Sequence, residues 1–267
     1  MDRHEEILTN NYHLGQEKIW DGREVLNELI CRHGRTNDPP PSVQHALNRI
    51  FTMILRGEEA AWKISLQLGN MLENVPARMA ATAQAHDEAR HFYVMQDYLR
   101  LHGASRVELP VAIDKALKMV LSTKCVAKKL VGMQLMIEPV ALTIFQEIRR
   151  MRVDPILADL LAYFEKDEAR HVALGVHALP QVIKDLSFTS LLGVLTWQTH
   201  LFMLELHGLK AMEDDFKTVG LNPHKLFFIA EKKQLAALEE IALHLGWHSA
   251  IWKPLQGLLR FQKKRIL

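Results

Sequence analysis

The 267-residue sequence has little of several residue types, and each shortage argues against a class of protein. Its two cysteines, Cys31 and Cys125, are too few for a disulfide scaffold and favour a reducing compartment. Lys and Arg number 33 against 31 Asp and Glu, so the net charge of +2 gives no support for nucleic-acid binding. No run of about 18 consecutive apolar residues indicates a membrane-spanning helix, and the polar start MDRHEEILTNNYHLG does not resemble a signal peptide. We therefore expect a cytoplasmic protein that binds neither nucleic acid nor membranes.

Glycine and proline are also scarce, with 13 and 10 residues, and most of them lie between long helix-forming stretches. No stretch shows the short alternating strands of a β domain, so the predicted fold class is all-α. Ser42 is expected to cap the first long helix, and Pro180 is expected to lie just beyond the fourth. We predict a single domain over residues 1–267. Its parts are an N-terminal extension (1–42), a bundle (about 43–180) with long helices at 43–73, 77–101, 124–151 and 154–178 and a short crossover helix at 113–121, and a C-terminal helical extension (186–267) divided near 220–223 and near Gly246.

The pentapeptide Asp-Glu-Ala-Arg-His occurs twice, at residues 87–91 and 167–171. Glutamate and histidine three positions apart lie one turn apart on the same face of a helix, so both side chains can reach one metal ion. A single pair of this kind is common by chance and is usually an ordinary surface pair. Two identical copies on two predicted helices indicate instead a site for two metal ions. The candidate ligands from this motif are Glu88, His91, Glu168 and His171.

A dimetal site of this type needs one further glutamate from each of the two other helices. In the helix expected at 43–73, Glu58 lies within a stripe of apolar and small residues, whereas its neighbour Glu59 lies on a polar face. We therefore prefer Glu58 and keep Glu59 as the alternative. In the helix expected at 124–151, Glu138 is an isolated acidic residue on an apolar stripe. An isolated acid there could also be a salt-bridged structural residue.

The spacing of the four glutamates supports this choice. Glu58 and Glu88 are 30 residues apart, and so are Glu138 and Glu168. Residues equidistant from the turn of an antiparallel hairpin face each other, and both midpoints fall within about three residues of a proline-containing helix stop. Four buried glutamates could not all stay ionised without cations. Two divalent ions would balance them, and mixed carboxylate and imidazole ligands suit iron or manganese.

With these residues, the sequence resembles the ferritin-like diiron-carboxylate superfamily, and most of all the hydroxylase subunits of bacterial multicomponent monooxygenases and the ribonucleotide reductase small-subunit group. The resemblance covers about residues 43–180. It implies a ferritin-like four-helix bundle with a long crossover between the second and third helices. It also implies two iron ions with O₂ as co-substrate, although manganese or a mixed Mn/Fe pair is compatible. Glu58, Glu88 and His91 would hold one ion, and Glu138, Glu168 and His171 the other, with Glu88 and Glu168 able to bridge.

The resemblance also implies roles for the other residues of the two pentapeptides. Asp87 and Asp167 would each accept a hydrogen bond from the far ring nitrogen of a ligand histidine, which fixes its tautomer. Arg90 and Arg170 would neutralise those aspartates, with an exposed surface ion pair as the alternative. Met95 stands where ribonucleotide reductase small subunits carry a radical tyrosine, so radical storage at that position is not expected.

Two functions are compatible with this site. The first is a diiron oxidase or oxygenase that activates O₂ to oxidise a small organic substrate, with electrons from a separate reductase or ferredoxin. The second is a ferroxidase, or another iron-handling or peroxide-scavenging protein. We expect a homodimer in the first case and a large cage in the case of storage. The residues predicted to line a substrate cavity are Ala61, Trp62, Ala141, Leu142 and Phe145.

Overall fold

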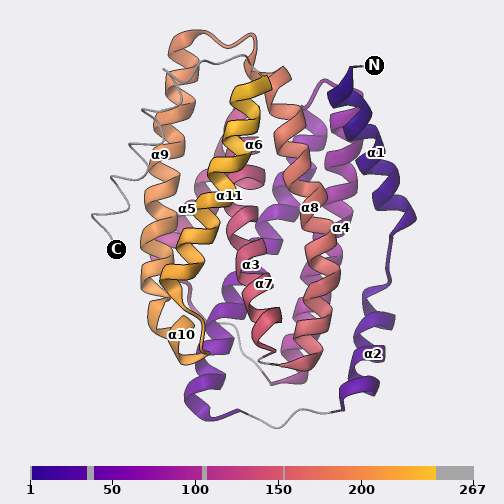
Figure 1. Cartoon of the computed structure of the whole chain (residues 1–267), viewed down its shortest axis with the longest axis vertical. Coiled ribbons are helices and arrows are strands. Elements are labelled where there is room, and N and C mark those ends of the chain that lie inside the picture. Colours follow the sequence, from indigo (N-terminus) through magenta and orange to yellow (C-terminus); the bar gives the residue numbers. More distant parts are fainter. Residues whose placement is uncertain (1, 35–38, 104–106, 153, 245–267) are drawn as a thin grey trace.

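The computed structural model describes residues 2–34, 39–103, 107–152 and 154–244, which contain helices and no strand (Figure 1). The all-α prediction is confirmed, whereas the predicted division near Gly246 lies outside the described residues. The helices of the described part are α1 (Arg3–Glu17), α2 (Gly22–His33), α3 (Pro41–Met71), α4 (Val75–Leu101), α5 (Val111–Ser122), α6 (Val126–Leu130), the π-helix η1 (Val131–Ile137), α7 (Glu138–Met151), α8 (Pro155–Ile183), α9 (Phe188–Ala211), α10 (Glu213–Thr218) and α11 (Pro223–His244).

Two helical hairpins form the centre of the molecule. Helix α3 packs on α4, α7 packs on α8, and α4 packs on α8, so that the two hairpins make a four-helix bundle. The turn of each hairpin ends in a side-chain cap. Asn74 accepts a hydrogen bond from the backbone N–H of Ala77 at 3.0 Å, and Asp154 accepts one from Leu157 at 2.7 Å. Helix α5 lies in the long crossover between the hairpins, as predicted.

Three details of the predicted helices are wrong. Helix α3 begins at Pro41, so Ser42 lies inside its first turn and does not cap it. Proline is favoured at this first position because its φ is already helical. Helix α8 continues through Pro180 to Ile183, whose side chain is buried in the core. The third long helix is interrupted by η1 directly before Glu138. Pro139 has no N–H to donate and its ring crowds the carbonyl four residues earlier, so a widened turn at this point relieves the clash.

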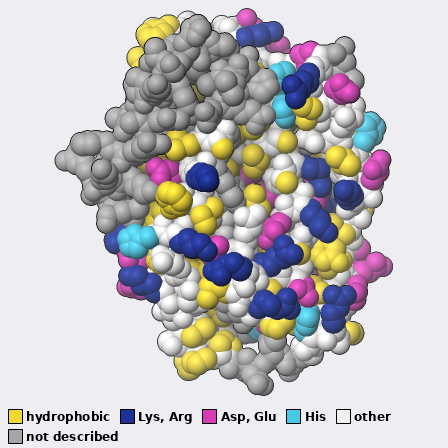
Figure 2. Space-filling model, viewed as in Figure 1, with side chains coloured by type: hydrophobic (Ala, Val, Ile, Leu, Met, Phe, Trp, Pro, Cys, Tyr) yellow, Lys and Arg dark blue, Asp and Glu magenta, His cyan; other side chains and the backbone are white. Residues whose placement is uncertain are grey.

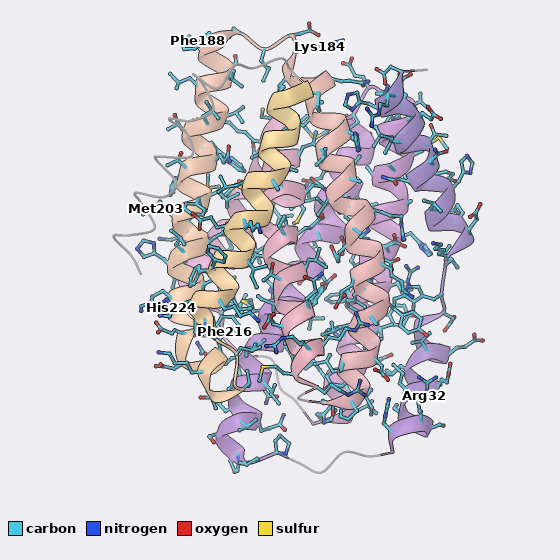
Figure 3. All side chains as sticks on the ribbon, in the orientation of Figure 1. Arg32, Lys184, Phe188, Met203, Phe216 and His224 are labelled. Atoms are coloured by element: carbon cyan, nitrogen blue, oxygen red, sulfur yellow. The ribbon has the colours of Figure 1, made fainter. Side chains whose placement is uncertain are left out.

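The segments outside the bundle cover two opposite sides of it. Helices α1 and α2 pack against α4 and α8, while α9 packs against α5, and α11 crosses α7 (Figure 1). Lys184 and Phe188 mark the turn from α8 to α9 at one end, and Phe216 of α10 lies at the other end (Figure 3). The Phe216 side chain is buried. The N-terminal and C-terminal additions therefore enclose the bundle from different sides.

The surface carries charges of both signs. On the face seen in Figure 2, Lys and Arg side chains lie beside Asp and Glu side chains, in keeping with the small net charge. Within the described residues, no helix combines the length and the apolar character required to cross a bilayer.

Candidate metal centre

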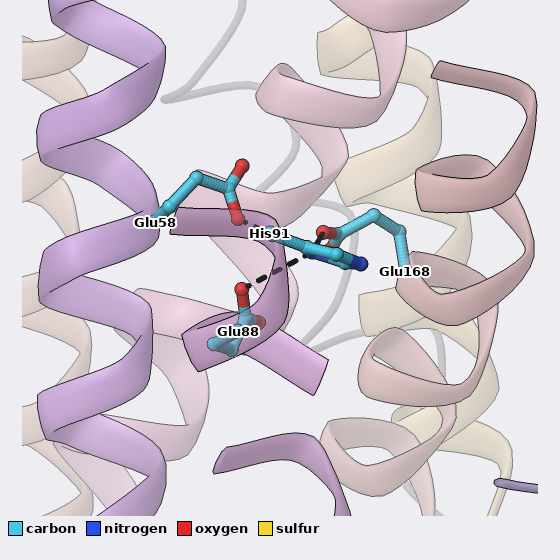
Figure 4. A group of neighbouring side chains, drawn as sticks. All are labelled: Glu58, Glu88, His91 and Glu168. Atoms are coloured by element: carbon cyan, nitrogen blue, oxygen red, sulfur yellow. Dashed lines mark hydrogen bonds and ion pairs between the residues drawn. The ribbon is translucent and has the colours of Figure 1, made fainter. Parts of the chain in front are cut away.

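Six side chains from the four bundle helices converge in the middle of the bundle, and all six are buried. They form two overlapping groups, in each of which one possible ligand atom per residue lies within 4.8 Å of the others. Figure 4 shows the first group, with carboxylates from α3, α4 and α8 around His91. The structure thus brings together the six residues that the sequence analysis preferred as ligands. The groups are Glu58, Glu88, His91 and Glu168, and Glu88, Glu138, Glu168 and His171.

Helix α3 contributes Glu58 rather than Glu59. The Glu58 side chain faces the cluster and is only 4% exposed. Glu59 lies outside the cluster and pairs with Arg56 at 2.5 Å and with Lys63 at 2.6 Å near the surface. The structure therefore places Glu58, the residue preferred from the sequence, in the cluster and Glu59 outside it.

The cluster holds more negative charge than its histidines can balance. Burial raises the pKa of Glu58 and the pKa of Glu138 well above the usual value. Burial acts in the same direction on Glu88, but the charge and hydrogen bonds of His171 and His91 outweigh it and lower the Glu88 pKa. At both histidines, burial is outweighed by the surrounding carboxylates, which raise the imidazole pKa well above the usual value. The site therefore requires added positive charge, as protons or as metal ions.

The residues present fit a pair of metal ions. Glu88 Oε2 and Glu138 Oε2 are buried side-chain atoms without a hydrogen-bond partner in the described part of the chain. A buried carboxylate oxygen without a partner carries a large desolvation cost, which a bound cation removes. Carboxylate oxygens combined with two imidazoles are the donor set expected for iron or manganese.

The two histidines are held by aspartates from the opposite hairpin. His91 Nε2 lies 3.0 Å from Asp167, and His171 Nε2 lies 3.3 Å from Asp87. The Nδ1 atoms of both rings face the glutamates instead, at 3.0–3.6 Å. Because each aspartate can accept the proton on Nε2, Nδ1 is the nitrogen that faces the candidate ligands, and it would bind a metal ion once it has lost its own proton. The predicted aspartate contacts exist, and they run crosswise between the repeats.

Both arginines of the repeated motif bridge the same two aspartates. Arg90 donates to Asp87 at 2.6 Å and to Asp167 at 2.9 Å, and Arg170 donates to Asp167 at 2.6 Å and to Asp87 at 3.0 Å. The side chain of Arg90 is 5% exposed and that of Arg170 is 13% exposed, so the exposed surface pair considered as an alternative is wrong. Burial alone would raise the pKa of Asp167, but His91, Arg170 and Trp20 lower it. The network keeps both aspartates ionised.

Sequence reasoning missed Trp20, which lies between α1 and α2. Its Nε1–H donates to Asp167 at 2.9 Å, and the Arg90 guanidinium lies 4.6 Å from the centre of the Trp20 ring. Gly22 allows this approach, because a Cβ there would lie 2.0 Å from a methyl group of Val94. No motif in the N-terminal segment indicates the contact. A second omission is Gln84, whose amide hydrogen-bonds two of the candidate ligands.

A cavity of about 110 Å³ opens on the glutamates of the cluster. All four glutamates line it, and its remaining described walls are apolar apart from Glu205 of α9. Apart from Glu88 of α4 and Glu168 of α8, the lining residues come from α3, α5, η1, α7 and α9. The crossover and the C-terminal extension therefore complete the cavity, while the N-terminal helices support the opposite side of the cluster.

Of the five residues predicted to line the cavity, Ala61 and Ala141 do so, and the other three do not. Trp62 lies beside Phe92 of α4, with ring centres 6.2 Å apart. Phe145 packs against Phe164, with ring centres 5.9 Å apart, and Leu142 follows Ala141 outside the lining. Each of the three is one position beyond a lining residue, which rotates its side chain by about 100° around the helix. That part of the prediction is wrong.

Comparisons with known proteins give the fold. No protein-family model and no curated protein matches the chain significantly. Among solved structures, a protein from Synechococcus with aldehyde deformylating oxidase activity is 18% identical, with a TM-score of 0.68, and the match covers 84% of this chain and 100% of that one. A variant of an R2-like ligand-binding oxidase with an anaerobically reconstituted Mn/Fe cofactor is 12% identical, with a TM-score of 0.73 and coverages of 87% and 92%. Another variant, with an Fe/Fe cofactor, is 11% identical, with a TM-score of 0.70 and the same coverages. These matches show the fold, and the predicted ferritin-like helical bundle is confirmed.

Proposed function

We propose that this protein is a dimetal-carboxylate oxidase or oxygenase that uses O₂ to oxidise a small organic substrate. The observation that carries the proposal is that two overlapping groups of buried ligands open on one apolar cavity. The structural neighbours named as oxidases support an oxidoreductase. Their Mn/Fe and Fe/Fe cofactors support two iron ions, or one manganese and one iron ion, as the metal content.

The side chains of the cluster would divide between the two ions. Bound metal ions of this kind supply the redox chemistry for the reduction of O₂. The protein would present both histidines through Nδ1, because Asp87 and Asp167 each hold the proton on Nε2. The first ion would be held by Glu58, Glu88, His91 and Glu168, and the second by Glu88, Glu138, Glu168 and His171.

The cavity walls favour substrate oxidation over iron storage. Met53, Ile113, Leu117 and Ile144 are among the lining residues, and such walls bind a carbon skeleton while excluding water from the metals. The volume of about 110 Å³ is comparable to that of cavities of about 150 Å³ that bind benzene. A small organic substrate would fit, and a separate reductase or ferredoxin would supply the electrons. An iron-storage protein needs no such cavity beside its metals.

The proposal is tested by loading the protein anaerobically with Fe(II) and mixing it with O₂. The expected result is rapid O₂ consumption with a change in the near-ultraviolet and visible spectrum. Both signals should be lost in Glu88→Ala and Glu168→Ala, and Glu59→Ala serves as the matched control that retains them. Loaded wild-type protein that consumes O₂ no faster than the two variants would contradict the proposal. Assembly into a large cage that accumulates ferric iron would support the storage function instead.

A further inference from the structure

Gln84 is a buried amide that links the two hairpins inside the cluster. It lies on α4, one turn before Glu88, and is 2% exposed. Its Nε2 donates to Glu138 Oε1 at 2.5 Å and to Glu88 Oε1 at 3.2 Å. Its carbonyl oxygen accepts a hydrogen bond from Gln134 Nε2 at 3.3 Å. Both N–H groups of the Gln84 amide are therefore directed at candidate metal ligands.

Close packing holds Gln134 in its place. It lies in η1, one turn before Glu138, and is fully buried. Gly175 of α8 faces it, and a Cβ at that glycine would lie 2.5 Å from the Cβ of Gln134. Only glycine allows η1 and α8 to approach this closely. Gln134 is consequently fixed where it can orient the Gln84 amide.

The amides of Gln84 and Gln134 have no equivalent at the positions 80 residues away, although the candidate ligands do. The ligands recur with an offset of 80 residues, as in Glu88 and Glu168. With that offset, the counterpart of Gln84 is Phe164 and the counterpart of Gln134 is Ile54. Phe164 stacks on His91, with ring centres 4.0 Å apart and an angle of 11° between the rings. One half therefore has amide donors where the other half has apolar side chains.

Glu58 and Glu138, the two candidate ligands outside the repeated pentapeptide, are held differently as a result. Glu138 Oε1 accepts the short hydrogen bond from Gln84, which leaves the buried Oε2 to face a metal ion. In the described part of the chain, the side-chain hydrogen-bond partner of Glu58 is His91, itself a candidate ligand. Reorienting Glu138 breaks a charge-assisted hydrogen bond, whereas reorienting Glu58 breaks no bond to a residue outside the ligand set.

We infer that Gln84 is a positioning residue that fixes Glu138 and makes the two metal positions inequivalent. The position bounded by Glu138 and His171 is the fixed one, and the position bounded by Glu58 and His91 is the adaptable one. The inference rests on the dimetal centre proposed above. It assigns to Gln134 a supporting role, since Gln134 acts through the Gln84 carbonyl.

The test uses Gln84→Met, which keeps the length of the side chain and removes the amide. Wild-type protein loaded anaerobically with ⁵⁷Fe(II) should show two Mössbauer quadrupole doublets of equal area. In Gln84→Met, one doublet should shift clearly more than the other, because the short bond at 2.5 Å goes to Glu138 of one group and the longer bond at 3.2 Å to Glu88, which both groups share. The affinity of one Fe(II)-binding step should fall about 10–100-fold. Two unchanged doublets and binding steps, or equal changes in both, would overturn the inference.

Three further variants keep the experiment decisive. Gln134→Met should shift the same doublet by a smaller amount. Gln198→Met removes a buried glutamine of α9 outside the cluster, and its two doublets should match the wild type. If Gln84→Met does not fold, Gln84→Asn retains an amide that is too short to reach Glu138 and should give the same shift. Wild-type protein that binds no pair of ions would refute the proposed function itself, whereas two ions with no effect of Gln84 would refute only this inference.

Discussion

Replacement of Asp167 by asparagine tests how the outer carboxylates hold the ligand histidines. The variant keeps the size of the side chain and replaces one acceptor oxygen by an amide donor. That donor would face other N–H groups, or would donate to His91 Nε2 and thereby place the ring proton on Nδ1, the wrong nitrogen for binding a metal. In the wild type, the Asp167 carboxylate accepts hydrogen bonds from His91, Trp20, Arg90 and Arg170.

The expected magnitude follows from these contacts. Loss of the acceptor behind a ligand histidine typically weakens metal binding about 10–100-fold, which is about 1.4–2.7 kcal/mol. The metal-free protein should lose about 2 kcal/mol in its free energy of unfolding, the worth of one charge-assisted hydrogen bond. The loss is limited because Asp87 still pairs with Arg90 at 2.6 Å and with Arg170 at 3.0 Å.

The assay is an anaerobic Fe(II) titration against a competing chelator, together with urea unfolding of the metal-free protein. Asp167→Asn should weaken the binding step that involves His91. Asp87→Asn is the matched variant, and it should weaken the other step by less, because the distance from His171 to Asp87 is 3.3 Å rather than 3.0 Å. If Asp167→Asn binds both ions within about twofold of the wild type, the crosswise support of the histidines is refuted.

Further predictions concern the ligands, the cavity and one surface ion pair. Glu58→Ala should lose one of two bound ions by elemental analysis, whereas Glu59→Ala should keep both; equal metal content in the two variants would be contrary evidence. Ala141→Phe fills the cavity beside the glutamates, so it should abolish substrate-stimulated O₂ consumption with the metal content unchanged, and retained stimulation would argue against this cavity. Burial acts to raise the pKa of Glu147, but Arg150 and Lys225 of α11, which lies 2.9 Å from the Glu147 carboxylate, lower it. The ion pair between Glu147 and Lys225 therefore stabilises the fold above about pH 4.5, and this stabilisation is lost as the pH falls through the folded-state pKa. Glu147→Gln should cost about 1 kcal/mol in urea unfolding at pH 7 and nothing at pH values below that pKa, and a cost that persists in acid would contradict this origin.

The convergence of the candidate ligands could be predicted from the sequence because helix periodicity and hairpin geometry determine it. Glu58 and Glu88 face each other since they are equidistant from a turn with recognisable stop signals, and the same rule relates Glu138 to Glu168. The interruption by η1 was not predicted. Its sequence has no periodicity that separates a π-helix from an α-helix, and Pro139 was the only local signal.

The surroundings of the cluster depend on contacts between distant segments, which periodicity does not specify. Helix α9 is apolar on nearly all sides, so its sequence does not show that Glu205 and Leu209 face the cavity. Trp20 reaches Asp167 from a segment 147 residues away. Gln84 did carry a signal, because it lies one turn before Glu88 on the same face of α4. Its bond to Glu138, however, is visible only when the two hairpins are assembled.

The most direct test of the central claim is the metal stoichiometry of the folded protein. Metal-free protein is titrated anaerobically with Fe(II), and the bound ions are counted per chain by elemental analysis after removal of the excess. Two ions per chain are predicted for the wild type, with a marked loss in Glu88→Ala and Glu168→Ala, which remove the two carboxylates shared by both groups. A folded wild-type chain that retains no iron or manganese, or whose metal content is the same in both variants, would contradict the account.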